Sequence, residues 1–120
     1  MTTLKTTKEK LEYKTTEGKK LVLEINTGDA EKVSAWFKVI ETSKKEFAGS
    51  DYIGAKAACK KIVASILSEK TFDKIVKVCN NNLSCILIIV LDIVERVSRA
   101  QYQFKEEIEE RAEALKTLGK

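Results

Sequence analysis

Residues 10–26 alternate apolar and polar positions in the way that is typical of half-buried β-strands. The segment TTEG interrupts the alternation, and its Gly18 can supply the positive φ that a tight turn requires. The pattern predicts an N-terminal β-hairpin. Because two strands alone are marginally stable in water, the hairpin must pack on helices or on another chain. The positions expected on its apolar face are Leu11, Tyr13, Leu21, Leu23 and Ile25.

From residue 29 to residue 80 the apolar positions recur at steps of three and four, which indicates amphipathic helices. Three helices are expected. Their caps are Thr27 or Asp29 for the first, Ser50 or Asp51 for the second, and Thr71 for the short third one. Their apolar stripes are Val33, Trp36, Phe37, Ile40 and Phe47, then Ala55, Cys59, Ile62, Val63, Ile66 and Leu67, then Phe72, Ile75, Val76 and Cys79.

Three consecutive asparagines, Asn80 to Asn82, separate the third helix from a long fourth one predicted over 83–118. Asparagine tolerates left-handed backbone and also caps helices, so the triplet can end one helix and start the next. Ile86, Ile89 and Ile93 widen the apolar face at the start, and the front half is therefore expected to be buried nearly all round. The sequence thus predicts a mainly helical α+β fold, a hairpin packed on three to four helices.

The back half of the long helix keeps only a narrow apolar seam, expected at Val97, Phe104, Ile108 and Leu115. A helix of this length spans about 50 Å, whereas a globule of 120 residues has a radius of gyration of about 14 Å. One end is therefore expected to project and to bind a partner through the seam. The alternative is that the helix bends back over the hairpin.

Composition is consistent with one folded domain over residues 1–120 that needs neither metal nor disulfide. The 22 basic and 18 acidic residues leave an excess that lies entirely in the first 61 residues, mainly in a flexible basic start over 1–9 and in the hairpin. The basic residues that give this excess are chiefly Lys5, Lys8, Lys10, Lys14, Lys19 and Lys20. Tyr13 is the only aromatic residue among them, so a surface on which nucleic-acid bases could stack is not favoured.

The three cysteines form no CxxC pair and the chain has no histidine, which argues against a metal site. Cys59, Cys79 and Cys85 are instead expected to be buried free thiols in a reducing compartment, the cytoplasm. The N-terminus lacks the apolar core of a signal peptide. The longest apolar run, Cys85 to Leu91, has seven residues, far fewer than the roughly 20 that cross a bilayer.

Catalytic chemistry is not indicated, and we expect neither an enzyme nor a cofactor. The chain has no histidine base, no glycine-rich phosphate loop and no GxSxG or HExxH motif. Trp36 and Phe37 lie on a helical stripe that favours core packing, and aliphatic neighbours suggest that Cys85 is inert. Five glutamates on the last helix are interpreted as a solvated face. They are Glu106, Glu107, Glu109, Glu110 and Glu113.

The order of elements resembles a tail assembly chaperone of long-tailed bacteriophages or prophages. The most specific part is residues 62–108, where a Thr-Phe-x-x-Ile segment starting at Thr71 precedes the asparagine loop and an aliphatic helix that ends in charge. The resemblance implies binding of the helical tape-measure protein, which the chaperone keeps soluble in the host cytoplasm until tail-tube subunits replace it. The lysine-rich start and the segment ILIIVL do not belong to the family pattern.

Two other functions compatible with the sequence are a homo-oligomerising interaction module built on the last helix and a nucleic-acid-binding accessory protein that uses the N-terminal lysines. The first predicts stable self-association through residues 97–118. The second predicts binding that weakens steeply as salt rises.

Overall fold

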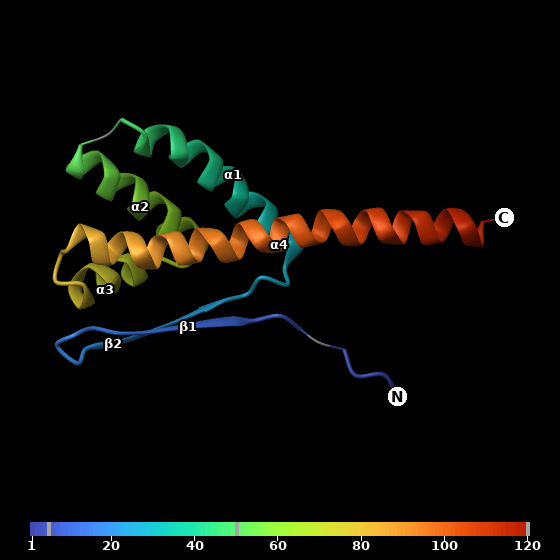
Figure 1. The fold of residues 1–120 in the computed structure, drawn as a ribbon, viewed down its shortest axis with the longest axis horizontal. Helices are drawn as coiled ribbons and strands as arrows, with labels where there is room; N and C mark the ends of the chain where they lie inside the picture. Colours follow the sequence, from blue (N-terminus) through green and yellow to red (C-terminus); the bar gives the residue numbers. More distant parts are fainter. Residues whose placement is uncertain (5, 50, 120) are drawn as a thin grey trace.

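Over residues 1–4, 6–49 and 51–119, the part of the chain that the computed structural model describes, an antiparallel hairpin is followed by four helices (Figure 1). The predicted fold class, mainly helical α+β with a long last helix, is confirmed. The elements are β1 (Glu9–Lys14), β2 (Lys20–Ile25), α1 (Ala30–Phe47), α2 (Tyr52–Ile66), α3 (Glu69–Val78) and α4 (Leu83–Leu118). Of the residues singled out above, Lys5 and Ser50 lie outside the described ranges.

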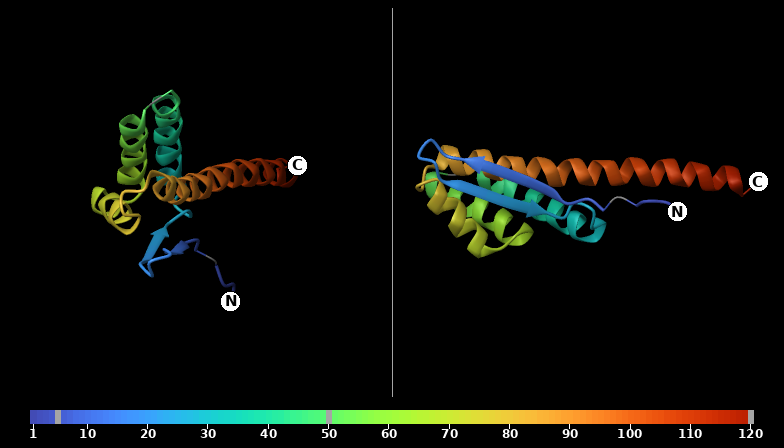
Figure 2. Two further views of the ribbon diagram at one scale, coloured as in Figure 1. Left: turned by 60° about the vertical axis from the view of Figure 1, so that its left-hand side comes forward. Right: turned by 90° about the horizontal axis from the view of Figure 1, so that it is seen from below.

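The elements form three layers around α4. The hairpin lies on one side of α4 and the α1–α2 pair on the other, while α3 packs near the start of α4 on the hairpin side (Figures 1 and 2). This arrangement gives α4 two apolar contact faces. The largest fully buried side chains of the core come from every layer and include Leu21, Ile25, Val33, Ile40, Val63, Ile75, Ile86, Ile93 and Val97.

The hairpin has the predicted apolar face. Leu11 lies opposite Leu23, and Tyr13 opposite Leu21. Leu11, Leu21, Leu23 and Ile25 are exposed by 5% or less. Gly18 adopts the expected positive φ of 86° in the turn. The two strands span 9–25, close to the predicted 10–26, and the turn between them lies at Thr15 to Lys19, where the Thr15 N–H donates to the Lys19 carbonyl at 2.8 Å.

Side-chain caps begin each of the first three helices. Asp29 accepts from the Lys32 N–H at 3.1 Å, and Asp51 from the Gly54 N–H at 2.9 Å. The predicted cap of α3 was wrong: Ser68, and not Thr71, accepts the hydrogen bond, and the Thr71 N–H is its donor at 3.0 Å. Ser68 has the extended backbone that a cap requires, and it starts the helix at Glu69. Thr27, the alternative cap of α1, is buried, and its Oγ1 has no hydrogen-bond partner within the described part of the chain.

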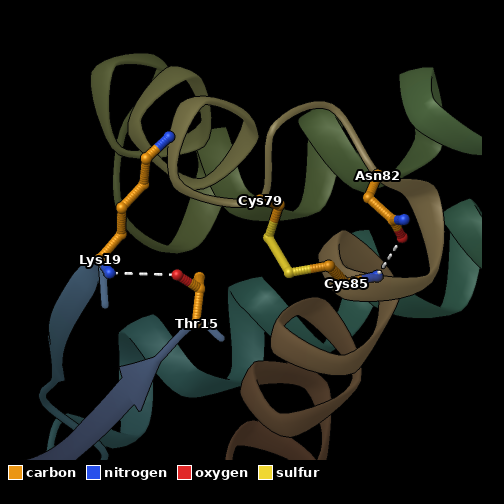
Figure 3. Close-up of a disulfide and its surroundings, with 5 residues drawn as sticks. All are labelled: Thr15, Lys19, Cys79, Asn82 and Cys85. Carbon is orange, nitrogen blue, oxygen red and sulfur yellow. Dashed lines mark hydrogen bonds between the residues drawn. A yellow bond between two sulfur atoms is a disulfide. The ribbon is translucent and has the colours of Figure 1, made fainter. Parts of the chain in front are cut away.

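The three asparagines have the two expected roles, a turn after α3 and an N-cap for α4. Asn80 and Asn81 adopt positive φ values of 55° and 56°, which turn the chain between α3 and α4. Asn82 is the N-cap of α4, and its Oδ1 accepts from the Cys85 N–H at 3.1 Å (Figure 3). The triplet therefore reverses the chain within three residues.

Cys79 and Cys85 are joined in a disulfide across this turn, facing the hairpin turn at Thr15 and Lys19 (Figure 3). The expectation of three free thiols was therefore wrong for this pair and holds for Cys59 alone. The reversal by the asparagines brings the Cα atoms of Cys79 and Cys85 to 5.6 Å, a normal separation for a disulfide. The spacing of the two cysteines along the sequence does not reveal that the chain reversal brings them close enough to form a disulfide.

The front half of α4 is less enclosed than predicted. Ile86, Ile89 and Ile93 are buried, but Ile88 and Leu91 are exposed by 60% and 62%. The hairpin and the α1–α2 pair cover two faces of the helix and leave the flanks between them open. The expectation that this half is buried nearly all round was therefore wrong.

Two polar contacts attach β1 to α4. The Tyr13 hydroxyl donates to Asp92 Oδ2 at 2.7 Å, and Arg96 Nη1 lies 3.4 Å from Glu9 Oε1. Desolvation by burial, followed by the hydrogen bond to the Asp92 carboxylate, raises the pKa of Tyr13 above its ordinary value. The apolar face of the hairpin is thus held in register on α4 by hydrogen bonds at specific positions.

We expect Tyr13→Phe to lower the free energy of unfolding by about 1 kcal/mol at pH 7, because it removes a hydrogen bond to a carboxylate. The raised pKa of Tyr13 in the folded state stabilises the wild type fully below the unfolded value of about 10, and this stabilisation is lost as pH rises further. The difference between the two proteins should therefore shrink above pH 10. Urea unfolding followed by Trp36 fluorescence at pH 7 to 11 measures it. A difference that does not change with pH would contradict the role assigned to the hydroxyl.

Candidate partner-binding site

The predicted partner-binding residues occupy one face of α4 but lie in two different environments. Val97 has no exposed surface and belongs to the core, so it is not at the surface where a partner could reach it. Phe104 is partly buried against the core. Ile108 and Leu115 are exposed by 68% and 69%. The apolar seam therefore begins inside the folded domain and emerges from it after Phe104.

Residues 105–118 form the projecting half of α4. Every one of these residues is exposed, and Figure 1 shows this segment extending beyond α1 and the hairpin. The molecule is elongated, with a longest dimension of 60 Å and a radius of gyration of 17.4 Å, against the roughly 14 Å of a globule of this length. Of the two arrangements left open by the sequence, the structure has the projecting helix.

A shallow hollow of about 450 Å³ lies where the first residue of α1 meets the projecting half of α4. Its lining is mainly apolar, with one acidic and one basic side chain at its edges. It is lined by Ala30, Phe104, Glu107, Ile108, Arg111, Ala112 and Leu115. Ile108 and Leu115 are one heptad apart, which is the spacing that knobs-into-holes packing with another helix requires. The hollow can therefore accept side chains from a single helix laid along α4.

Charged side chains flank the apolar seam of the projecting half and leave its apolar side chains exposed to solvent. The segment carries five glutamates and three basic residues, Lys105, Arg111 and Lys116. The ion pair between Arg111 and Glu110, at 3.9 Å, is exposed and contributes little to stability. Within the described ranges, no group of three or more His, Cys, Asp or Glu residues could hold a metal ion. The chemistry available here is non-covalent recognition of an apolar helix with charged edges.

Sequence inspection missed part of this surface. Leu118, exposed by 83%, continues the seam seven residues after Arg111. Its place in the repeat was visible in the sequence, but Arg111 interrupts the apolar pattern. Ala30 could not have been assigned, because only the packing of α1 on α4 brings it to the seam.

A second apolar hollow, which we call the α1–α4 wedge, lies on the body of the protein and was not predicted. It has a volume of about 320 Å³. It lies between the C-terminal half of α1 and the front half of α4, with α2 beneath. Ile40 and Phe47 line it from α1, Cys59 and Ile62 from α2, and Leu91 and Val94 from α4. Burial raises the pKa of the Cys59 thiol, which favours its protonated form.

The comparisons give no relative from which a function could be transferred. None of the helices in the described part of the chain is both long and apolar enough to span a bilayer. Searches against protein-family models, curated proteins and solved structures find no match to this chain.

Proposed function

We propose that this protein is an assembly chaperone that binds helical segments of a client through the projecting half of α4. The observation that carries the proposal is the exposed seam of Ile108 and Leu115 on the projecting half of α4, in which every residue from 105 to 118 is exposed. An apolar stripe left exposed on an ordered helix is typical of a surface that pairs with another helix.

The client that fits the resemblance is the tape-measure protein of a long-tailed phage, bound in the host cytoplasm. A long helical protein exposes apolar stripes before its assembly partners cover them, and a charged helix with one narrow seam can shield such a stripe. The seam offers few apolar side chains to a partner. Binding of this kind is readily reversible, as it must be if tail-tube subunits later replace the chaperone.

The test begins with the DNA that flanks the gene. A neighbouring long frame that encodes a helical protein supplies the client for co-expression. We expect the wild type to increase the soluble fraction of that client and to bind it in a pull-down. Ile108→Asp with Leu115→Asp should weaken binding by at least about tenfold, because two apolar side chains are lost from the contact.

Tyr102→Asp is the matched control. Tyr102 is exposed by 64% on the same helix but lies off the seam, so this variant should bind the client as the wild type does. All three proteins should melt alike, since the substituted side chains are exposed. Equal client binding by wild type and the double variant, or the lack of any such client near the gene, would overturn the proposal.

A further inference from the structure

We propose that the Cys79–Cys85 disulfide is a thiol-exchange site, at which a peptide thiol of the glutathione class forms a mixed disulfide with Cys85. The two cysteines form a bond with each other and line a hollow at the surface of the protein. The proposal concerns the turn between α3 and α4 and does not depend on the proposed function.

The hollow beside the disulfide is large enough to admit such a molecule. It has a volume of about 510 Å³, which is within the range of small-molecule sites. Cys79 and Cys85 both line it, and the hairpin turn contributes residues 13–17 to the lining. Figure 3 shows the disulfide facing that turn. A dissolved thiol can therefore approach this disulfide, which would not be so for one enclosed in the core.

The two cysteines differ in exposure, and this difference decides where an incoming thiolate attacks. Cys79 is buried, with 4% of its surface exposed, whereas Cys85 is only partly buried in the first turn of α4. The rate of thiol–disulfide exchange depends on access to the sulfur that is attacked. Attack should therefore fall on Cys85 Sγ, with Cys79 as the leaving group.

The exchange balances with the thiol as its only co-reactant. The incoming thiolate forms a bond to Cys85 Sγ, the bond between the two cysteines breaks, and Cys79 leaves as a thiolate that takes up a proton from water. A second molecule of the thiol then attacks the mixed disulfide, which reduces Cys85 and releases the thiol as its own disulfide. The protein gains two electrons and two protons, and two thiols are oxidised. The same steps in reverse form the protein disulfide again.

The lining of the hollow matches the polar groups of a peptide thiol. Lys14 and Glu17 line it with one charge of each sign, and neither forms an ion pair within the described part of the chain. Hydroxyl and amide groups also line it, those of Thr15, Thr16, Asn80 and Asn82. A peptide thiol of the glutathione class carries carboxylates, an ammonium group and amides, so each kind of group has a partner in the hollow.

The turn between α3 and α4 has contacts that hold it while the disulfide is open. The Asn81 N–H donates to the Val76 carbonyl at 2.8 Å, and the Asn82 N–H donates to the Cys79 carbonyl at 3.0 Å. These hydrogen bonds keep the two sulfurs close, so Cys79 can displace the bound thiol from Cys85. The exchange is therefore reversible within the folded protein.

Variants that keep one cysteine of the pair test which sulfur reacts. We expect Cys79→Ser, incubated with oxidised glutathione, to gain one glutathione on Cys85 and to keep it, because the thiol that would displace it is gone. Cys85→Ser keeps only the buried Cys79 and should react at least about tenfold more slowly. Mass spectrometry of the intact protein gives the rates, and peptide mapping gives the site. Cys59, which is free and buried, should stay unmodified in both variants and is the internal control.

The wild type tests reversibility without any substitution. In mixtures of reduced and oxidised glutathione it should pass between disulfide and dithiol while its circular dichroism spectrum stays that of the folded protein. Alkylation of the free thiols followed by mass spectrometry measures the two forms.

A lysine substitution tests the class of thiol. In the Cys79→Ser background, Lys14→Ala should slow the reaction with oxidised glutathione by about threefold, the effect of one exposed ion pair. The reaction with uncharged bis(2-hydroxyethyl) disulfide should not change. Lys19→Ala is the matched control, since Lys19 is exposed in the same turn but does not line the hollow.

The other outcomes overturn the proposal. A wild-type disulfide that resists reduced glutathione until the chain unfolds excludes exchange in the folded protein. Equal rates for Cys79→Ser and Cys85→Ser show that access does not select Cys85. If Lys14→Ala has no effect, or if Lys19→Ala or the uncharged disulfide shows the same effect, the hollow does not select a peptide thiol.

Discussion

Val97→Asp should abolish the cooperative unfolding transition, although Val97 lies on the same helical stripe as the exposed seam. The side chain has no exposed surface and belongs to the core cluster that joins the hairpin and the helices. A carboxylate at this place loses its hydration without gaining a partner, which typically costs more than about 4 kcal/mol. Since small domains are stable by only about 5 to 15 kcal/mol, little or no stability should remain. Thermal melting followed by far-UV circular dichroism measures this.

Ile108→Asp, eleven residues further along the same stripe, is the matched comparison. Ile108 is exposed by 68%, and a polar residue there should change the free energy of unfolding by no more than about 0.5 kcal/mol. The pair of variants locates the point where the stripe leaves the core. If both variants melted like the wild type, Val97 would not be buried as described. If both unfolded, the projecting half would belong to the core.

Reduction of the disulfide should lower the free energy of unfolding by about 2 kcal/mol. Cys79 and Cys85 are six positions apart, and closing so short a loop restricts the unfolded chain only modestly. Urea unfolding of the oxidised and reduced protein gives the difference. In a reducing cytoplasm the bond would be open, and the asparagine turn would hold the ends of α3 and α4 without it.

The control for this experiment is a variant with Cys79→Ala and Cys85→Ala, whose stability should not respond to the reductant. Thiol titration in denaturant gives an independent readout. The oxidised wild type should present one reactive thiol, that of Cys59, because the other two cysteines are paired. Three reactive thiols before reduction, or an equal effect of reductant on the variant, would show that the bond does not stabilise the fold.

The sequence predicted the parts of the fold that depend on local pattern. Alternation fixed the apolar face of the hairpin, and steps of three and four located the helices. The three asparagines, which tolerate left-handed backbone and cap helices, predicted the turn before α4. Each of these signals arises from neighbours along the chain. The cap of α3 was missed because Ser68 and Thr71 are both good caps three residues apart, and a single helical turn separates the two choices.

The features that sequence pattern could not supply all depend on contacts between distant segments. Val97, Ile108 and Leu115 lie on the same helical stripe and have similar chemistry, and only the position of α1 and the hairpin decides which of them is covered. The wedge results from the angle between α1 and α4, which no local pattern encodes. The disulfide depends in the same way on a chain reversal that brings two separated cysteines together.

One continuous helix, α4, links the core to the projecting half, and this continuity lowers the entropy cost of binding a partner. A free peptide of about 14 residues would be only marginally helical in water, since helix nucleation is unfavourable and propagation adds little per residue. Here the buried residues up to Ala100 supply the nucleus, and residues 105–118 only extend it. The projecting segment is therefore preorganised before any partner arrives. Much of the backbone ordering that a disordered binding segment would undergo at the interface has already occurred when the chain folds.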